Sequence, residues 1–334
     1  MMIVPSFWAE ARAQYRRKGR QITVRRFGWS DASQEDAQQN AQLRVGEALA
    51  RAVSGEPLPR RERKVPYNGG DGLPIREEVV DRIGETVITR NGYGARCMNT
   101  PNVLFVDIDF NDGPGKRMIW GTALFLLAAG AVMLVLMAAA GKGIGRLLAV
   151  AAVGVLLTLV LSAPIAQLVH RMVVRAQGGP EAIARKNILR FMATRPDWLV
   201  HLYRTPAGFR LLATHRLFDP LDAEVAECFD ALATDPVYAA MCLNQHCFRA
   251  RVSAKPWRIG IEDHIRPRPG TWPVLPERLP ARRAWLERYD RAAAGFAACR
   301  FVESIGKGAS NPAAQAVKQL HDELSRAHST LPIA

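Results

Sequence analysis

Two uncharged apolar segments near the middle of the 334-residue chain constrain its fold more than any other feature. Residues 118–141 and 147–169 contain no Asp, Glu, Lys or Arg. As helices of 24 and 23 residues, each reaches about 35 Å, which exceeds the hydrocarbon core of a bilayer at about 30 Å. Residues 142–146 between them are too few for a domain. We therefore predict a hairpin of two transmembrane helices.

The basic residues around this hairpin predict its orientation. Six Lys and Arg residues lie outside the two segments, within about 20 residues of them, and two lie in the loop. The six are Lys116, Arg117, Arg171, Arg175, Arg185 and Lys186. Because cytoplasmic flanks carry the excess of positive charge, we expect both termini in the cytoplasm. The excess of Arg over Lys is typical of a GC-rich bacterial genome, so we expect the bacterial inner (plasma) membrane.

The remaining chain is basic, with a formal net charge of +14, and 49% of all residues are hydrophobic. That hydrophobic fraction excludes a disordered tail, and five cysteines are too few for a disulfide scaffold. We expect these cysteines to be reduced thiols in the cytoplasm. Beside a membrane, the basic surface is expected to meet anionic lipid head groups.

Composition divides the chain into five parts. They are a basic strand–helix segment at 1–64, the first part of an α/β domain at 65–116, the transmembrane hairpin at 117–170, the remainder of the α/β domain at 171–264, and a Pro-rich connector with a helical pair at 265–334. In the first part, Ser30 and Asp31 are expected to cap a helix that runs to about Val53. In the last part we expect helices at 281–305 and 312–328, with His321 on an exposed face.

Residues 103–253 predict one α/β (α+β) unit. Strands are expected at 103–110, 198–204, 209–214 and 247–253, and helices at 180–194, 222–233 and 236–244. In chain order this gives strand, helix, strand, strand, a helical part formed by 222–233 and 236–244, and strand, with the transmembrane hairpin inserted after the first strand. That order is typical of a ferredoxin-like split β-α-β unit.

The strand at 103–110 carries the strongest chemical signal. Its alternation places Asp107 and Asp109 on one face. Two carboxylates in an apolar strand are costly unless an opposite charge pairs with them. A divalent cation such as Mg²⁺ would do so, and so would arginines such as Arg210. Asp107 and Asp109 are therefore candidates for catalysis or metal binding, and a structural Asp–Arg network is the alternative.

Basic residues provide a second candidate site. The candidates for phosphate binding are Arg210, Arg249, Arg251, Lys255 and Arg258. Cationic side chains bind phosphate oxygens, and Trp257 offers a face for stacking. The alternative is a basic edge strand that its arginines keep soluble and that ends at Pro256.

The segment Leu104-Phe-Val-Asp-Ile-Asp109 resembles the acidic first motif of palm-type archaeo-eukaryotic primases. The resemblance implies that these carboxylates hold two Mg²⁺ ions. Residues 203–210 resemble the second motif, a Gly-containing hairpin with a histidine, although Arg210 stands at the histidine position and no clear third acidic motif follows. Residues 107–112 are also similar to the start of a diguanylate cyclase domain, whose Gly-Gly-Asp/Glu-Glu-Phe signature is missing downstream.

Larger parts of the chain resemble a family of uncharacterised bacterial transmembrane proteins. The similar segments are Phe27-Gly-Trp-Ser30, Arg96-Cys-Met-Asn-Thr-Pro101 with the following Asp-Ile-Asp, residues 247–258 and residues 321–326. The resemblance implies a membrane protein and brings no established activity.

Two hypotheses of function follow. In the first, the chain is an integral inner-membrane protein whose cytoplasmic domain binds a phosphorylated ligand. In the second, it is a Mg²⁺-dependent nucleotidyl- or phosphoryl-transfer enzyme that uses Asp107 and Asp109. The expected partners are the lipid bilayer and anionic lipid head groups. A nucleotide or nucleic acid is open but has no specific motif, and Gly and Ala in both spans would permit a homo-oligomer.

Overall fold

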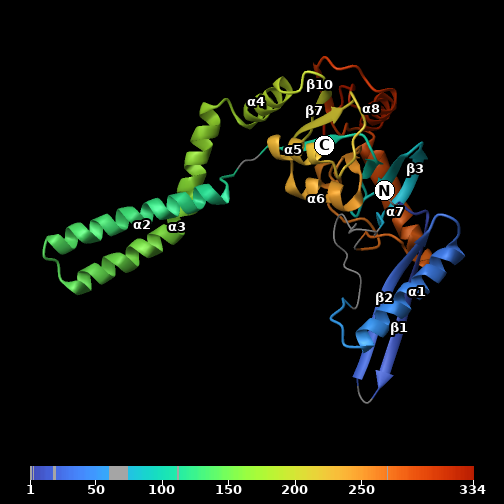
Figure 1. Ribbon diagram of the computed structural model, residues 1–334, viewed down its shortest axis with the longest axis horizontal. Coiled ribbons are helices and arrows are strands. Elements are labelled where there is room, and N and C mark those ends of the chain that lie inside the picture. Colours follow the sequence, from blue (N-terminus) through green and yellow to red (C-terminus); the bar gives the residue numbers. More distant parts are fainter. Residues whose placement is uncertain (1, 3, 18–19, 60–73, 111–112, 269) are drawn as a thin grey trace. The chain divides into compact units, whose positions relative to one another are not determined.

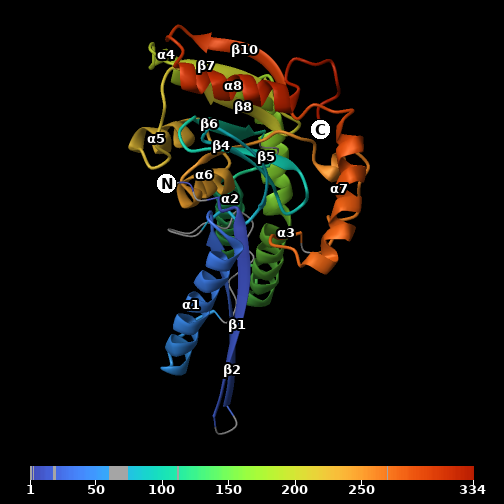
Figure 2. The same ribbon diagram turned by 90° about the vertical axis from the view of Figure 1, so that its right-hand side faces the viewer.

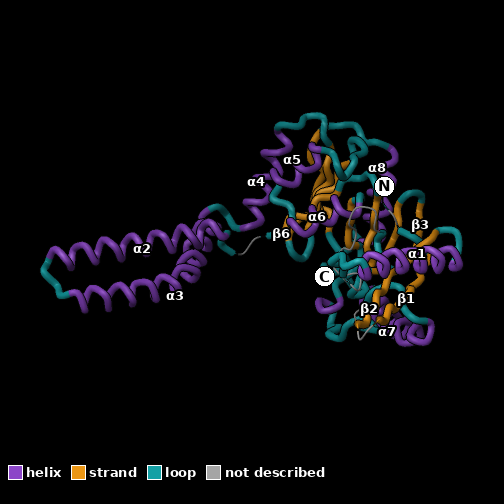
Figure 3. Tube along the Cα trace, turned by 60° about the horizontal axis from the view of Figure 1, so that its bottom comes forward, coloured by secondary structure: helices purple, strands orange, loops and turns teal. Residues whose placement is uncertain are grey.

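The computed structural model describes residues 2, 4–17, 20–59, 74–110, 113–268 and 270–334, and it divides into two compact units (Figure 1). One unit comprises Met1–Asp109 and Phe191–Ala334, and the other comprises Phe110–Arg190. Strands occur in the first unit, whereas the described part of the second is helical (Figure 3).

The helical unit contains the predicted hairpin. Helices α2 (Lys116–Ala139) and α3 (Ile144–Ala176) lie antiparallel and side by side (Figure 1). Both are long and apolar enough to cross a membrane, and most of their large apolar side chains are exposed. The structure confirms the two apolar helices, with α3 extending beyond its expected end at residue 169. Helix α4 (Pro180–Ala193) follows after a Gly-Gly turn, as predicted.

The first part of the chain is a long β-hairpin with a helix on one face. Strands β1 (Phe7–Arg17) and β2 (Arg20–Ser30) pair antiparallel, and α1 (Gln34–Val53) packs on them through small residues such as Ala37 and Ala41. Gly28 is required at this contact, because a Cβ there would lie 2.1 Å from the Ala41 backbone nitrogen. The predicted cap was wrong: Ser33 accepts from the Asp36 N–H and begins the helix.

A four-stranded antiparallel sheet contains the carboxylate strand. Its order is β10-β7-β8-β6, formed by β6 (Phe105–Asp109), β7 (Leu199–Arg204), β8 (Gly208–Ala213) and β10 (Arg300–Gly306). Asp107 lies directly opposite Arg210 in the β6–β8 ladder. Gly208 permits this ladder, because a Cβ there would lie 1.9 Å from the Ile108 carbonyl oxygen.

A second four-stranded antiparallel sheet has the order β3-β4-β5-β9. Its strands are β3 (Glu78–Ile83), β4 (Thr86–Arg90), β5 (Arg96–Thr100) and β9 (Phe248–Arg251). The strand expected at 247–253 therefore pairs with β5 rather than with β6. The mixed α/β architecture is confirmed, and β6, β7 and β8 have the neighbours expected of a ferredoxin-like unit. The complete ferredoxin-like arrangement is not confirmed, because β9 belongs to the other sheet.

Helices cover these sheets. Asp222 and Asp235 precede α5 (Ala223–Ala231) and α6 (Pro236–Gln245), close to the predicted ranges. Two short 3₁₀ turns, Pro256–Arg258 and Pro276–Arg278, precede α7 (Leu279–Ala293). Helix α8 (Pro312–Ser325) packs across the β10-β7-β8 sheet (Figure 2).

The predicted helix at 281–305 was wrong in its second half. Helix α7 ends at Ala293, and Arg300–Gly306 forms strand β10, which pairs with β7. The alternating burial of Phe301-Val-Glu-Ser-Ile305 gives the physical reason, since a period of two suits a strand at a sheet edge.

Candidate functional site

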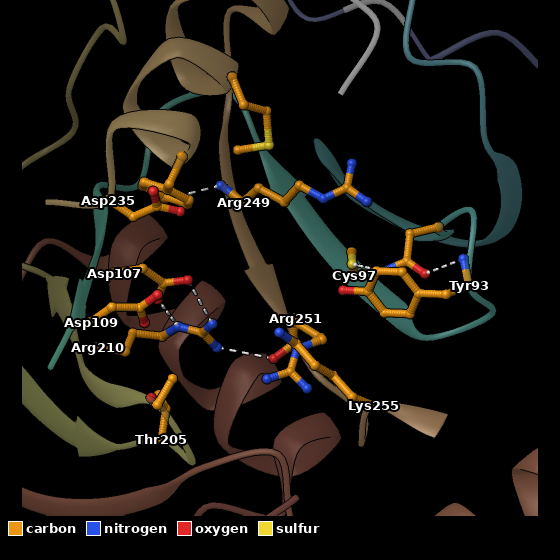
Figure 4. Close-up of a pocket in the computed structure, with 14 residues that line it drawn as sticks. Tyr93, Cys97, Asp107, Asp109, Thr205, Arg210, Asp235, Arg249, Arg251 and Lys255 are labelled. Atoms are coloured by element: carbon orange, nitrogen blue, oxygen red, sulfur yellow. Dashed lines mark hydrogen bonds and ion pairs between the residues drawn. The ribbon is translucent and has the colours of Figure 1, made fainter. Parts of the chain in front are cut away.

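A polar pocket in the α/β unit brings most of the predicted site residues together. It has a volume of about 130 Å³, and the two four-stranded sheets and helix α6 supply its walls (Figure 4). Of the seven candidate residues, six line it: Asp107, Asp109, Arg210, Arg249, Arg251 and Lys255. The seventh, Arg258, interacts electrostatically with Asp109 and Arg251. Asp235, Tyr93 and Thr205 also line the pocket and were not predicted.

The first buried ion pair of the pocket joins the two strands of the β6–β8 ladder. Arg210 donates through Nε to Asp107 Oδ1 at 2.8 Å and through Nη2 to Oδ2 at 3.2 Å. Its third nitrogen donates to the Arg251 carbonyl at 3.0 Å. Burial alone would lower the pKa of Arg210, but Asp107 outweighs burial and raises it. Asp107 is thus held by Arg210, as the alternative of an Asp–Arg network expects.

The second buried ion pair joins β9 to the segment before β3. Arg249 donates through Nη2 to Glu77 Oε2 at 2.6 Å, and Thr89 donates its hydroxyl to the same oxygen at 2.6 Å. Arg249 is 4% exposed. An arginine buried this deeply is stabilised by its carboxylate partner, and removing that partner is costly. Arg210 and Arg249, both predicted to bind phosphate, are therefore engaged with carboxylates.

The other cations are arranged differently. Among the described residues, no Asp or Glu side chain lies within ion-pair distance of Arg251, Lys255 or Arg258, and Nη1 of Arg258 is buried without a hydrogen-bond partner. Among the described residues, Arg251 donates through Nη1 to the Ser253 carbonyl at 3.3 Å and to the terminal oxygen of Ala334 at 3.5 Å. Burial lowers the pKa of Lys255, and the neighbouring charges of Arg251 and Arg258 lower it further. These three residues, which we call the cationic rim, repel one another and would gain from a bound anion.

Two carboxylates stand apart from this rim. Asp109, exposed on β6, has no hydrogen bond or ion pair among the described side chains, and Asp235 accepts from the Val237 N–H at the start of α6. Partial desolvation by the surrounding protein raises the pKa of Asp109, the charges of Asp107 and Asp235 raise it further, and those of Lys255 and Arg258 oppose the rise. Figure 4 shows Asp109 and Asp235 on one side of the pocket, with Arg251 and Lys255 across from them. We call these two residues the acidic rim.

Two aromatic rings lie beside the cationic rim. Tyr93, in the loop between β4 and β5, packs edge-to-face on Trp257 with ring centroids 5.1 Å apart. The Lys255 ammonium lies 5.4 Å from the Trp257 ring centroid. Trp257 is 55% exposed, so the predicted stacking face is accessible.

The metal hypothesis has less support than the ion-pair alternative. Among the residues that the structure describes, no group of three or more His, Cys, Asp or Glu side chains is arranged to hold a metal ion. Both oxygens of Asp107 already accept from Arg210. The Asp109 carboxylate has no such partner among the described side chains. The Mg²⁺ hypothesis therefore requires Asp109 and the oxygens of a phosphorylated ligand to bind the ion together.

A buried histidine behind Arg210 was not predicted correctly. His321 was expected on an exposed helix face, yet it is fully buried and its Nε2 lies 3.5 Å from Arg210 Nη1. Its Nδ1 lies 3.2 Å from Asp322, which also binds Lys318 and His328. Burial alone would lower the pKa of His321, but Cys299 and Asp322 outweigh burial and raise it. The spacing of α8 offered one signal, because residues 314, 321 and 325 share its buried face.

His201 and His215 contact neighbouring side chains, and the cysteines are buried. His201 hydrogen-bonds to Ser304 and Thr214 through its two ring nitrogens, at 2.8 and 2.9 Å. His215 packs on Trp198. All five cysteines are free and buried, which matches the expectation of reduced thiols.

Comparisons with protein-family models, with curated proteins and with solved structures find no match for this chain. Its resemblances to the primases and to the bacterial transmembrane family therefore stay predictions, and the geometry of the pocket carries the functional argument.

Proposed function

We propose that this protein is a membrane protein whose α/β unit binds a small phosphorylated ligand through the cationic rim. The observation that carries this proposal is the contrast within the pocket. Arg210 and Arg249 each form an ion pair with an Asp or Glu side chain, whereas Arg251, Lys255 and Arg258 form none with an Asp or Glu side chain among the described residues. Burial lowers the pKa of Lys255 and of Arg258, the charge of Arg251 lowers both further, and Asp109 opposes this only in part. A bound phosphate would relieve the remaining repulsion.

The size of the pocket narrows the ligand class. Its volume of about 130 Å³ is well below the roughly 300–1,000 Å³ of sites that enclose drug-sized molecules. A phosphate group with a few further atoms fits, and a whole nucleotide would have to extend outside, where Trp257 offers a stacking face.

The membrane part of the proposal rests on α2 and α3. Their apolar side chains are exposed over lengths that can span a bilayer. With Lys and Arg concentrated outside the pair, we propose a bacterial inner-membrane protein with both flanks in the cytoplasm. The small residues of both helices leave a homo-oligomer open.

Anionic lipid is the partner we propose for the β1–β2 hairpin. Strand alternation puts Arg12 and Arg16 on the face opposite α1, where both are exposed. On the same face Arg25 pairs with Glu10. In nanodiscs with anionic lipid, backbone hydrogen exchange of this hairpin should be slower than in nanodiscs with neutral lipid, and equal rates would contradict this assignment.

The Mg²⁺-dependent transferase is the second candidate, and the available carboxylate of Asp109 beside the cationic rim favours it. Its test is a thermal-shift titration with Mg²⁺ and nucleoside triphosphates. A shift that needs both metal and triphosphate and is lost in Asp109→Asn would support the enzyme. The absence of any metal-dependent shift would exclude it.

Inorganic phosphate tests the first proposal on the detergent-solubilised chain. Phosphate should raise the melting temperature by mass action, and the Lys255→Gln/Arg258→Gln variant should lose this response. Lys307→Gln removes an exposed cation outside the pocket and should respond like the wild type. A response of equal size in all three proteins would overturn the assignment to the cationic rim, as would no response in any of them.

A further inference from the structure

The pocket has two rims of opposite charge, and a phosphate alone accounts for only one of them. The cationic rim contributes three positive charges and the acidic rim two negative charges, while Asp107 is neutralised by Arg210. A bare phosphate bound near Lys255 would be repelled by Asp109, because the charges of Asp109 and Lys255 already interact across the pocket.

From this juxtaposition we infer that the ligand is a small phosphorylated amine, whose phosphate lies on the cationic rim and whose ammonium lies beside Asp109 and Asp235. The inference rests on the proposed phosphate site and specifies its substrate class. A two-carbon link between phosphate and ammonium suits a pocket of about 130 Å³.

The surroundings of the acidic rim support an ammonium group. Asp109 lies near Asp107 and Asp235. Desolvation raises the pKa of Asp109 and these two carboxylates raise it further, so a cation placed there would relieve the repulsion among them. One carboxylate oxygen of Asp235 accepts a hydrogen bond from the Val237 N–H at the N-terminus of α6. The other oxygen can accept from a donor of the ligand. Thr205 also lines the pocket and offers a hydroxyl oxygen as a further acceptor.

A metal ion is the competing occupant of the acidic rim. Ions such as Mg²⁺ demand near-octahedral oxygen ligands and usually bind through one or two carboxylates plus phosphate oxygens. Within the described part of the chain, no three His, Cys, Asp or Glu side chains are arranged to hold a metal ion, at this rim or elsewhere. An organic ammonium group needs only nearby negative charge and hydrogen-bond acceptors, without a fixed coordination geometry. The two carboxylates of the acidic rim meet these requirements.

The test compares 2-aminoethyl phosphate with propyl phosphate, which has the same shape but a methyl group in place of the ammonium. Calorimetric titration of the full chain in detergent should show binding of the amine at least about tenfold tighter than that of propyl phosphate. Equal affinities in the wild type would overturn the inference and leave the phosphate site intact. No binding of either compound or of inorganic phosphate would instead overturn the proposed function.

Variants of the acidic rim sharpen this comparison. Asp109→Asn should weaken binding of 2-aminoethyl phosphate and strengthen binding of propyl phosphate, because it removes an attraction for one and a repulsion for the other. A change of the same sign for both compounds would contradict the inference. Asp235→Asn is the second variant, since asparagine still caps a helix well, and its effects should have the same signs.

Two further arms identify the cation and the source of the ligand. If Mg²⁺ raises the affinity for propyl phosphate to that of the amine, and Asp109→Asn abolishes this gain, the acidic rim binds a metal and the inference is wrong. Glycerophosphoethanolamine, a phosphodiester, separates the sources within the inferred class. Binding as tight as that of 2-aminoethyl phosphate indicates a lipid head group, and binding at least about tenfold weaker indicates a free phosphomonoester.

Discussion

The buried pairs and the open rims of one pocket contrast in how their charges are satisfied. Arg210 and Arg249 each bind a carboxylate and are at most 4% exposed. Arg251, Lys255 and Arg258 lie only a few residues after Arg249, yet among the described residues they form no ion pair with an Asp or Glu side chain. The same residue types therefore serve the fold at one position and remain available for a ligand at another.

This contrast separates stability from binding. A buried pair that loses one partner leaves an unpaired charge in the interior. A partly exposed cation that is removed leaves only water and a weaker attraction for anions. Substitutions in the two groups should thus affect different measurements: the stability of the fold for the buried pairs, and the affinity for anions for the cationic rim.

The largest expected loss of stability comes from breaking the Asp107–Arg210 pair. Arg210→Met should lower the free energy of unfolding by about 3 kcal/mol, because Asp107 is then left beside an apolar side chain. The double variant Arg210→Met/Asp107→Leu should recover part of this loss. Denaturant unfolding in detergent measures both, with Lys255→Met as the matched control. If Arg210→Met lowers the free energy of unfolding no more than Lys255→Met does, Arg210 does not stabilise the fold and resembles the residues of the cationic rim.

His201 gives the next largest effect, through pH. Burial lowers the pKa of His201 to about 4, while the unfolded chain binds a proton there near pH 6.5. Between these values the unfolded state holds more protons, so stability falls as the pH falls, by at most about 3 kcal/mol. Unfolding curves of wild type and His201→Asn between pH 6.5 and 4 measure this, and identical pH dependence in both proteins would refute it.

The cationic rim should show the opposite pattern. Lys255→Gln should change the free energy of unfolding by less than about 0.5 kcal/mol while weakening phosphate binding at least about tenfold. Paired measurements of unfolding and of calorimetric affinity check both halves. A variant that loses stability but keeps its affinity would reverse the assignment of the two groups.

Asp109 gives the smallest expected effect on stability. Its pKa is raised in the folded state, so its ionisation disfavours folding as the pH rises through that pKa. At neutral pH Asp109→Asn should therefore raise the melting temperature slightly, and this gain should vanish at a pH low enough to protonate Asp109. A destabilised variant at neutral pH would mean that Asp109 has a stabilising partner.

Local patterns predicted much of this molecule. The two apolar helices, the strand with Asp107 and Asp109, and the hairpin of β7 and β8 follow from charge-free length, period-two alternation and a Pro-Ala-Gly turn. Each of these features depends mainly on residues close together in the chain.

Long-range pairing explains what the sequence did not reveal. Strand β9 lies beside β5 because of tertiary contacts that a list of elements in chain order does not contain. Whether an arginine has a carboxylate partner is likewise a tertiary property: Arg249 finds Glu77, 172 residues away. His321 is buried because α8 packs on the sheet, and its neighbours along the helix gave only the buried face.

A structure of the protein with 2-aminoethyl phosphate bound would test the central claim most directly. We predict that the phosphate lies within hydrogen-bond distance of Lys255 and Arg258 and the ammonium beside Asp109, with the Asp107–Arg210 pair unchanged. A phosphate bound to Arg210, with that pair broken, or a ligand located outside this pocket would contradict it.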